Sequence, residues 1–482
     1  MLNYFFKKGI KFIPIILLIL IPAFLFGNEG AHESKELGAI LSLWWTIPFA
    51  GILLSIALFP LLLPDVWHHH FGKISLFWGL VLAIPFLLVY QGEAWEGILE
   101  TALGDYVPFL ILLWALYVVG GGIVIRGSFI GTPKVNTLLL FIGAIMASFT
   151  GTTGASMILI RPLLRANKKR VHKVHTVVFF IFLVSNIGGL LTPLGDPPLF
   201  MGFLHGVPFF WTMTNLIPEW LFANAVLLSV FFVLDSYFYK KEADEAKEKA
   251  KTHVPVKIAG SVNFIFLIGI VAGVLFSGFV HLGEISLGPI ELKIESELRD
   301  LFLITMGFAS LYFTPKELHE ENGFTWVAIE EVAILFASIF ITMIPAIEIL
   351  RAGSEGHFAF LINAIKEPYH YFWSTGILSS FLDNTPTYLT FFNTAQGAFA
   401  PGLSEHAAVQ GIIAHHNIYL KAIATGAVFM GANTYIGNAP NFMVKSIAEE
   451  SGIAMPSFFG YIFKYSLIFL IPVFILITII FF

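Results

Sequence analysis

Residues 192–201 read TPLGDPPLFM, and residues 434–443 read TYIGNAPNFM. The two stretches match in register at Thr, Gly, one Pro, Phe and Met, which indicates an internal repeat. Each lies within an apolar part of the chain. Proline there interrupts a helix, because it lacks a backbone N–H and clashes with the preceding turn. Each stretch therefore predicts a helix that is broken near its middle.

Two polar interruptions precede these stretches, one in each half of the chain. TGTTG at 150–154 interrupts the apolar segment 135–165, and DNTPT at 383–387 interrupts the apolar segment 369–399. The aligned pairs are Phe149 with Phe381 and Thr153 with Thr385. Unpaired backbone groups are costly in hydrocarbon, so polar tips of this kind must lie against protein or water. We interpret both segments as re-entrant hairpins.

The composition of the chain indicates a protein of the lipid bilayer. Of its 482 residues, 57% are hydrophobic and 12% are charged, whereas about 25% are charged in an ordinary soluble domain. The 27 basic and 32 acidic residues give a net charge of −5, which leaves no basic surplus for binding nucleic acid. The absence of cysteine excludes disulfides, thiolate metal sites and thiol nucleophiles.

The apolar segments predict an all-α polytopic membrane protein. A spanning helix needs about 20 mostly apolar residues, and by this criterion we expect about 10 to 11 spans. The segments 176–204 and 418–448 contain the two breaks. The full set of expected spans is 38–59, 75–91, 107–125, 176–204, 217–239, 261–282, 298–313, 327–350, 418–448 and 457–482.

The repeat divides the chain into two similar units. The first unit covers 38–239 and the second covers 261–482, and each holds one hairpin and one broken helix. A charged cytoplasmic linker at 240–260 joins them. The segment 1–37 begins with basic residues and continues with a short apolar run. It is interpreted either as a signal peptide or as a first transmembrane helix.

The distribution of basic residues predicts the orientation, because Lys and Arg are retained on the cytoplasmic side of a membrane. The densest basic cluster, RPLLRANKKRVHK at 161–173, places the open end of the first hairpin in the cytoplasm. Counting spans from there places the acidic loop 93–105 outside and the charged run 240–251 inside. The first unit therefore begins outside and the second begins inside, so the two units are inverted relative to each other.

Inverted repeats with discontinuous helices are typical of secondary transporters. When two similar halves exchange conformations, one central site is moved from one side of the membrane to the other. A channel and a membrane enzyme are the alternatives. No signature of a hydrolase or a redox site accompanies the repeat, so we do not expect an enzyme.

Two acidic residues lie at the depth of the spans, where an ionisable side chain is costly and indicates a functional site. Asp196 lies in the first broken helix, and Asp383 lies at the tip of the second hairpin. Hydroxyl and amide oxygens in the same loops suit a dehydrated Na⁺ ion. These donors are Thr152, Thr153, Thr192, Asn384, Thr385, Thr387, Asn433, Thr434 and Asn438. A carboxylate in such a site would hold a proton until a cation displaces it, which is a mechanism for cation/proton exchange.

Several of these residues also have a purely structural interpretation. Asp196 and Asp383 could cap helices by accepting backbone N–H bonds. Asn186 could belong to the site or form an interhelical hydrogen bond. Glu348 and Arg351 are expected to form an ion pair at the membrane interface.

The tips FTGTTGASM and FLDNTPTYL and the loops TPLGDPPLF and TYIGNAPNF resemble those of the NhaD-type sodium/proton antiporters. These belong to the ion transporter superfamily, which also holds ArsB-type arsenite carriers, citrate carriers and divalent anion/sodium symporters. The resemblance covers residues 38–482 and is concentrated in the four motifs. It implies an elevator-type carrier, usually a dimer, in which the hairpins and broken helices move against a scaffold of the other spans.

The residue at position 196 favours a cation as the substrate. Carboxylate-carrying relatives have neutral tips and a neutral residue where this chain has Asp196. No Lys or Arg occurs in the four loops, so two aspartates beside a citrate trianion would repel it unless bound sodium cancelled their charge. We therefore expect a Na⁺/H⁺ antiporter of the bacterial inner membrane, with Na⁺ as transported ion and no cofactor. A citrate or dicarboxylate carrier is the second hypothesis, and a cation channel is the third.

Overall fold

The computed structural model describes residues 34–127, 130–243 and 255–482, and this part of the chain is mostly helical. Within it, seven helices are long and apolar enough to cross a membrane. These segments are Leu43–Leu62, Pro64–Gly121, Pro133–Thr150, Val174–Leu191, Trp211–Lys240, Trp326–Arg351 and Phe458–Phe481. The expectation of a polytopic helical membrane protein is thereby confirmed. The expected segment 1–37 lies almost entirely outside the described residues, as does much of the linker 240–260.

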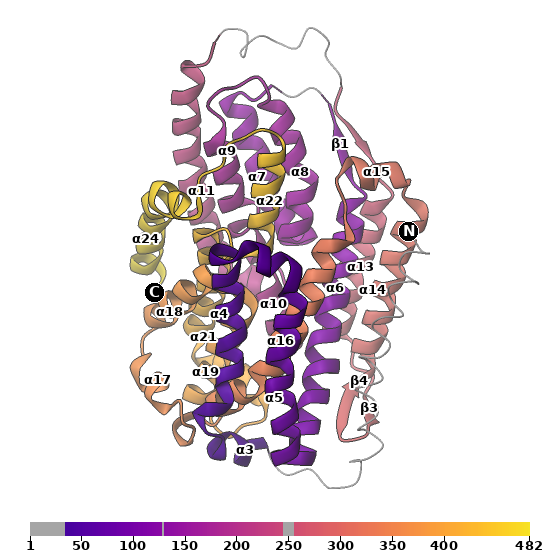
Figure 1. The fold of residues 1–482 in the computed structure, drawn as a ribbon, viewed down its shortest axis with the longest axis vertical. Helices are drawn as coiled ribbons and strands as arrows, with labels where there is room; N and C mark the ends of the chain where they lie inside the picture. Colours follow the sequence, from indigo (N-terminus) through magenta and orange to yellow (C-terminus); the bar gives the residue numbers. More distant parts are fainter. Residues whose placement is uncertain (1–33, 128–129, 244–254) are drawn as a thin grey trace.

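The first half of the chain contains three long helices, then a hairpin, a broken helix and a last long helix (Figure 1). The long helices are α4 (Ile47–Leu62), α5 (Pro64–Glu100) and α6 (Val107–Gly121), preceded by α3 (Ser34–Ile40) and η2 (Leu43–Thr46). A π-helical turn, η3 (Thr101–Tyr106), joins α5 to α6. The strand β1 (Val124–Arg126) and the helices α7 (Pro133–Thr150), α8 (Thr152–Ala166), α9 (Val174–Leu183), η4 (Ile187–Leu191), α10 (Pro197–Leu204) and α11 (Trp211–Lys240) follow.

The second half follows a comparable order. It opens with β2 (Lys257–Ala259), α13 (Asn263–Phe279), the strands β3 (Glu284–Leu287) and β4 (Ile290–Lys293), α14 (Ile294–Phe313), α15 (Lys316–Glu321) and α16 (Trp326–Arg351). After η5 (Gly353–Glu355) and α17 (Ala359–Ala364) come α18 (Pro368–Phe381), α19 (Asn384–Phe399), α20 (Glu405–His415), α21 (Asn417–Met430), η6 (Gly431–Asn433) and α22 (Ala439–Glu450). The described chain ends with α23 (Phe458–Tyr461), η7 (Ile462–Leu470) and α24 (Ile471–Phe481).

The second expected span, 75–91, is part of a much longer helix. The helix α5 begins at Pro64, where a proline is tolerated because the first helical N–H needs no partner. It passes through Gln91, whose φ of 43° and ψ of −108° are not helical. The chain bends at this residue, and residues 93–100 continue as helix beyond it.

The tip of the first hairpin depends on one glycine. Gly151 separates α7 from α8 and has a φ of +77°, a conformation that residues with a Cβ rarely adopt. The second hairpin, formed by α18 and α19, turns at Leu382 and Asp383. In both pairs of helices, a polar turn separates two apolar helices.

The elements expected on opposite sides of the membrane lie at opposite ends of the molecule. Figure 1 shows α15, β1 and the end of α11 at the upper end, and α3, β3 and β4 at the lower end. The strands β1 and β2 pair antiparallel, with Ile125 opposite Ile258, so they join the end of α6 to the start of α13. The basic segment 161–173 connects α8 to α9 at the upper end.

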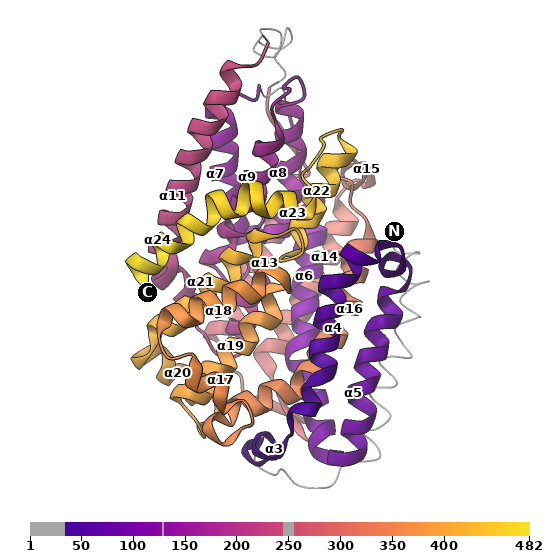
Figure 2. The same cartoon turned by 60° about the vertical axis from the view of Figure 1, so that its left-hand side comes forward.

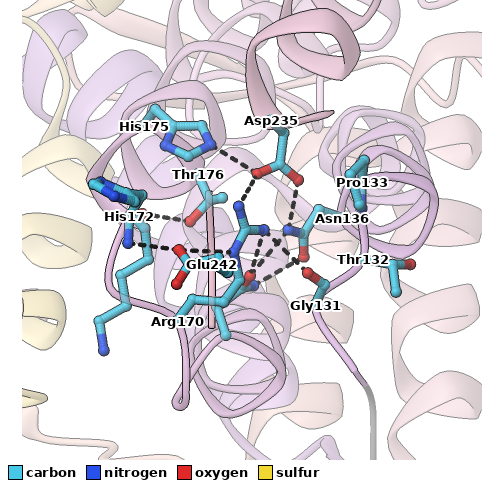
Figure 3. A network of polar contacts seen from close by, with 12 residues as sticks. Gly131, Thr132, Pro133, Asn136, Arg170, His172, His175, Thr176, Asp235 and Glu242 are labelled. Atoms are coloured by element: carbon cyan, nitrogen blue, oxygen red, sulfur yellow. Dashed lines mark hydrogen bonds and ion pairs between the residues drawn. The ribbon is translucent and has the colours of Figure 1, made fainter. Parts of the chain in front are cut away.

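A network of buried polar residues holds the upper ends of four segments together (Figure 3). Asp235 of α11 forms an ion pair with Arg170 of the α8–α9 loop, with 2.5 Å between Oδ1 and Nη2. The same carboxylate lies 2.7 Å from Nε2 of His175 in α9 and accepts a 2.9 Å hydrogen bond from Nδ2 of Asn136 in α7. Glu242 accepts hydrogen bonds from two backbone N–H groups of the α8–α9 loop. All these side chains are buried, so the network fixes these helix ends relative to one another.

Replacing Asp235 with Asn should lower the stability of the protein strongly. The change leaves the buried guanidinium of Arg170 without its shortest ion pair, and removing one partner of a buried pair costs about 3–5 kcal/mol. The midpoint of thermal unfolding in detergent measures this loss. Lys316→Ala is the matched control, because it removes an exposed pair with Glu320 on α15 and should leave the midpoint almost unchanged. Equal midpoints for the two variants would contradict the structural role of the network.

Candidate functional site

Asp196 lies at the start of α10 but does not cap that helix. It precedes Pro197 and has an extended backbone, with φ −141° and ψ 140°, as expected of a residue before proline. The side chain is 1% exposed and makes no capping hydrogen bond. The capping role that was its alternative interpretation is therefore absent for the side chain of Asp196.

The carboxylate of Asp196 accepts hydrogen bonds from three neutral side chains. Thr152 donates from Oγ1 to Oδ1 at 2.9 Å, and Asn438 donates from Nδ2 to the same oxygen at 3.1 Å. Asn384 donates to the other oxygen, Oδ2. These three donors come from the first hairpin tip, the second broken helix and the second hairpin tip. The four sequence motifs therefore meet at one carboxylate.

Asp383 has the capping role that was its alternative interpretation. Its Oδ1 accepts a 3.0 Å hydrogen bond from the backbone N–H of Thr385, and its carbonyl oxygen accepts a 3.0 Å bond from Oγ1 of Thr387. Asp383 forms no hydrogen bond with Asp196, but it lines a cavity that also reaches Thr152 and Thr153. Asp383 thus borders the same region without sharing hydrogen bonds with Asp196.

The two broken helices form the same kind of hydrogen bond to their hairpins. Thr192 donates from Oγ1 to the carbonyl oxygen of Ser148, and Thr434 donates from Oγ1 to that of Ser380 at 2.5 Å. Each threonine oxygen also accepts a backbone N–H from two residues further along the chain, at 3.2 Å in both cases. The two serines directly precede Phe149 and Phe381, which align in the sequence.

Asn186 forms the interhelical hydrogen bond that was its alternative role. Its Nδ2 donates to Oδ1 of Asn441 at 2.7 Å. Asn441 in turn donates from Nδ2 to the carbonyl oxygens of Gly431 and Thr434, both at 2.9 Å. Sequence reasoning missed Asn441 and the two serines, although all three lie inside or next to the repeated motifs.

Several buried oxygens near the tips have no hydrogen-bond donor. They are Oδ1 of Asn186, Oδ1 of Asn384, Oγ1 of Thr385 and Oδ1 of Asn433. A buried polar atom without a partner costs free energy, and amide and hydroxyl oxygens are ligands that a hard cation such as Na⁺ prefers. The donor set at the tips therefore suits a small cation.

A cavity of about 570 Å³ adjoins the tips. Its lining includes the first tip at 150–154, residues of the two breaks and parts of α4, α6 and α16. It also includes His68 near the start of α5 and Thr325 just before α16, two elements that run from the middle of the molecule toward its lower end (Figure 2). In the part of the chain that the structure describes, the acidic residues lining it are Glu331 and Asp383, and neither Lys nor Arg lines it.

Comparison with known protein families agrees with a transport role. Residues 38–482 match the model of a family described as "Putative citrate transport". The chain belongs to this family. No curated protein is similar enough to the chain to count as a match. The family is one of transporters, and together with the seven apolar helices it indicates a multi-pass membrane protein. It also fits the citrate-transporter-like superfamily, whose motifs the four motifs of this chain resemble.

Removing the hydroxyl of Thr192 or of Thr434 should destabilise this member of the citrate-transport family by similar amounts. Thr192→Val and Thr434→Val each leave a buried serine carbonyl without its donor, at a cost of about 1–3 kcal/mol. Thermal unfolding in detergent measures both effects. Thr305→Val is the control, because Thr305 is exposed on α14 and bonds only within its own helix. If only one of the two variants were destabilised, the two breaks would not be equivalent.

Proposed function

We propose that this protein is a secondary transporter of the bacterial inner membrane that exchanges cytoplasmic Na⁺ for external H⁺. The proposal is carried by one observation, the buried carboxylate of Asp196 with three neutral donors at the junction of the four motifs. An intramembrane carboxylate marks an ion or proton pathway in most membrane proteins. With no basic side chain among these donors, Asp196 is available to a proton or to a cation.

The two occupants of the site would compete for the same oxygen atoms. A deprotonated Asp196 supplies full charge to a Na⁺ ion, and the unpartnered oxygens of Asn384 and Thr385 supply further ligands. When Asp196 binds a proton, its charge is neutralised and the cation loses its strongest ligand. Occupation by one ion therefore releases the other, which is the condition for exchange.

Alternating access by an elevator movement fits the organisation around the site. In this proposal the units 38–239 and 261–482 are inverted repeats, and their hairpins and broken helices move together against the other spans. This movement is supported by the matching hydrogen bonds of Thr192 and Thr434 to their hairpins. It is also supported by the equivalent positions of Asp196 and Asn438. The NhaD-type classification and a homodimeric state belong to the same proposal.

A Na⁺- or H⁺-coupled citrate or dicarboxylate carrier is the second candidate. Membership in the citrate-transport family favours it. A cavity of about 570 Å³ also exceeds the needs of a single ion. Because neither Lys nor Arg lines the described cavity, a citrate anion would need bound cations at the tips to balance its charge.

Everted membrane vesicles with a pH-sensitive dye test the antiport. Addition of Na⁺ should release protons from acidified vesicles, and Asp196→Asn should reduce this signal at least about 100-fold, because the amide can neither bind a proton nor supply charge. Asp65→Asn is the control, since Asp65 is an exposed carboxylate in the first turn of α5 and should keep the full signal.

Uptake of labelled citrate, measured in the same cells, separates the two candidates. Citrate uptake without any Na⁺-induced proton signal would replace the antiporter by the citrate carrier. If Asp196→Asn retained normal exchange or uptake, the assignment of the site would be wrong for either function.

A further inference from the structure

A cluster of charged residues lies at the lower end of the molecule, away from the end toward which the cavity extends. Arg351 at the end of α16 approaches Glu405 at the start of α20, with 2.6 Å between Nη2 and Oε1. The same Oε1 of Glu405 lies 2.7 Å from Nδ1 of His205, which follows α10. Nε2 of His205 lies 3.3 Å from Oδ1 of Asp105 in η3. The four charged residues thus form a continuous chain of ion pairs.

The cluster differs from the arrangement expected for Arg351. The expected pair with Glu348 exists only at 4.0 Å between Oε1 and Nη1, whereas Arg351 has much shorter contacts with Glu405 and with Oδ1 of Asn393 in α19, both at 2.6 Å. The partners of Arg351 are therefore on other helices. Their separation in sequence left no local pattern that could reveal them.

The cluster joins two groups of helices. Arg351 and Asp105 belong to the group of α5, α6 and α16, in which Oη of Tyr106 also bonds to the carbonyl oxygen of Ala333 in α16. His205 and Glu405 belong to α10 and α20, which pack with α19 and so with the tips and breaks. Figure 2 shows α4, α5 and α16 on one side of the molecule and α18, α19 and α20 on the other. The two groups also pack directly against each other, most extensively through α16 and α19, and the ion pairs add a charged contact between them.

Two residues of the cluster, His205 and Glu405, are charged at neutral pH. Burial lowers the pKa of His205, but the carboxylates of Glu405 and Asp105 outweigh burial and raise this pKa to about 9. Burial raises the pKa of Glu405, but Arg351 and His205 outweigh it and hold this pKa below its usual range. His205 therefore contributes as a cation, fully below pH 6.5 and progressively less as the pH rises through about 9.

The cluster is only partly shielded from solvent. The side chains of Arg351 and Glu405 are 29% and 31% exposed, whereas those of Arg170 and Asp235 are 2% and 0% exposed. A partly exposed pair can exchange its partner for water at modest cost, while a buried pair cannot. The charged cluster is thus the kind of contact that can open and close repeatedly.

We propose that the cluster of Asp105, His205, Arg351 and Glu405 is a latch that closes the lower end of the transport pathway. In the present structure the cavity reaches from the tips to α22, which lies in the upper half of the molecule (Figure 1), and the latch holds the helices together at the other end, where α20 lies (Figure 2). Exposure of the site to the lower side requires α10, α19 and α20 to separate from α16 and η3, which breaks these ion pairs. The proposal rests on the alternating access of the proposed function.

Single-cysteine labelling tests the latch, because the natural chain contains no cysteine. Ser446→Cys places a reporter in the cavity lining. Thr390→Cys places a second reporter on the face of α19 that carries Asn393, one turn nearer the tip. A membrane-impermeant maleimide is applied from the upper side for the first reporter and from the lower side for the second. The labelling rates then report which end is open.

Glu405→Gln should speed labelling at Thr390→Cys about tenfold and slow it at Ser446→Cys, because losing a charged contact of this kind shifts the equilibrium toward the open lower end. His205→Gln removes contacts of the same latch and should act in the same direction, so the test survives if one variant fails to fold.

Glu405→Asp keeps the charge and should remain near the parent rates. Lys316→Ala, which breaks an exposed pair on α15, should change neither rate.

Unchanged rates in both Glu405→Gln and His205→Gln, or changes in the same direction at both reporters, would overturn the latch. The labelling needs neither Na⁺ nor citrate, so its outcome does not depend on which ion is carried. A protein that fails the dye and citrate assays but shows opposite changes at the two reporters would refute the proposed substrates and retain the latch.

Discussion

The structure depends on satisfying the backbone where two helices break inside the apolar part of the molecule. Each break leaves N–H and C=O groups without helical partners, which hydrocarbon cannot solvate. Thr192 and Thr434 solve this in the same way, since each hydroxyl accepts a backbone N–H and donates to a serine carbonyl of the neighbouring hairpin. These bonds fix each break against a hairpin. The side chains that follow the breaks, Asp196 and Asn438, are thereby brought face to face.

The residues around the site occupy symmetric positions in the two halves of the chain, but their charges are not symmetric. Asp196 and Asn438 occupy equivalent positions in the two breaks, and Thr152 and Asn384 occupy equivalent positions in the two tips. Three of these four side chains are neutral and donate to the fourth. A second carboxylate at position 438 would face Asp196 across a hydrogen-bond distance and repel it strongly. The asymmetry therefore allows one carboxylate to be buried with three neutral donors bonded to it.

The sequence was sufficient to predict the motifs but not their contacts. Proline, glycine and polar residues within apolar segments locate the breaks and tips, because these signals act within a few residues along the chain. The hydrogen bonds of Asn384 and Asn438 to Asp196 cross between the two halves of the chain. The role of Asp383 as a cap depended on a backbone geometry that a sequence does not specify. Only the packing of the helices decides such partners.

Two ionic networks of the described chain differ in their exposure to solvent. The network around Asp235 joins α7 of the first hairpin to α9 and α11, and its side chains are buried. Breaking it would leave charges without water or partners, at a cost of several kcal/mol, so it keeps these helices rigid throughout any movement. The pairs around Glu405 connect different groups of helices and remain partly hydrated. Water can replace each lost partner there, so helices can separate at this end at modest cost.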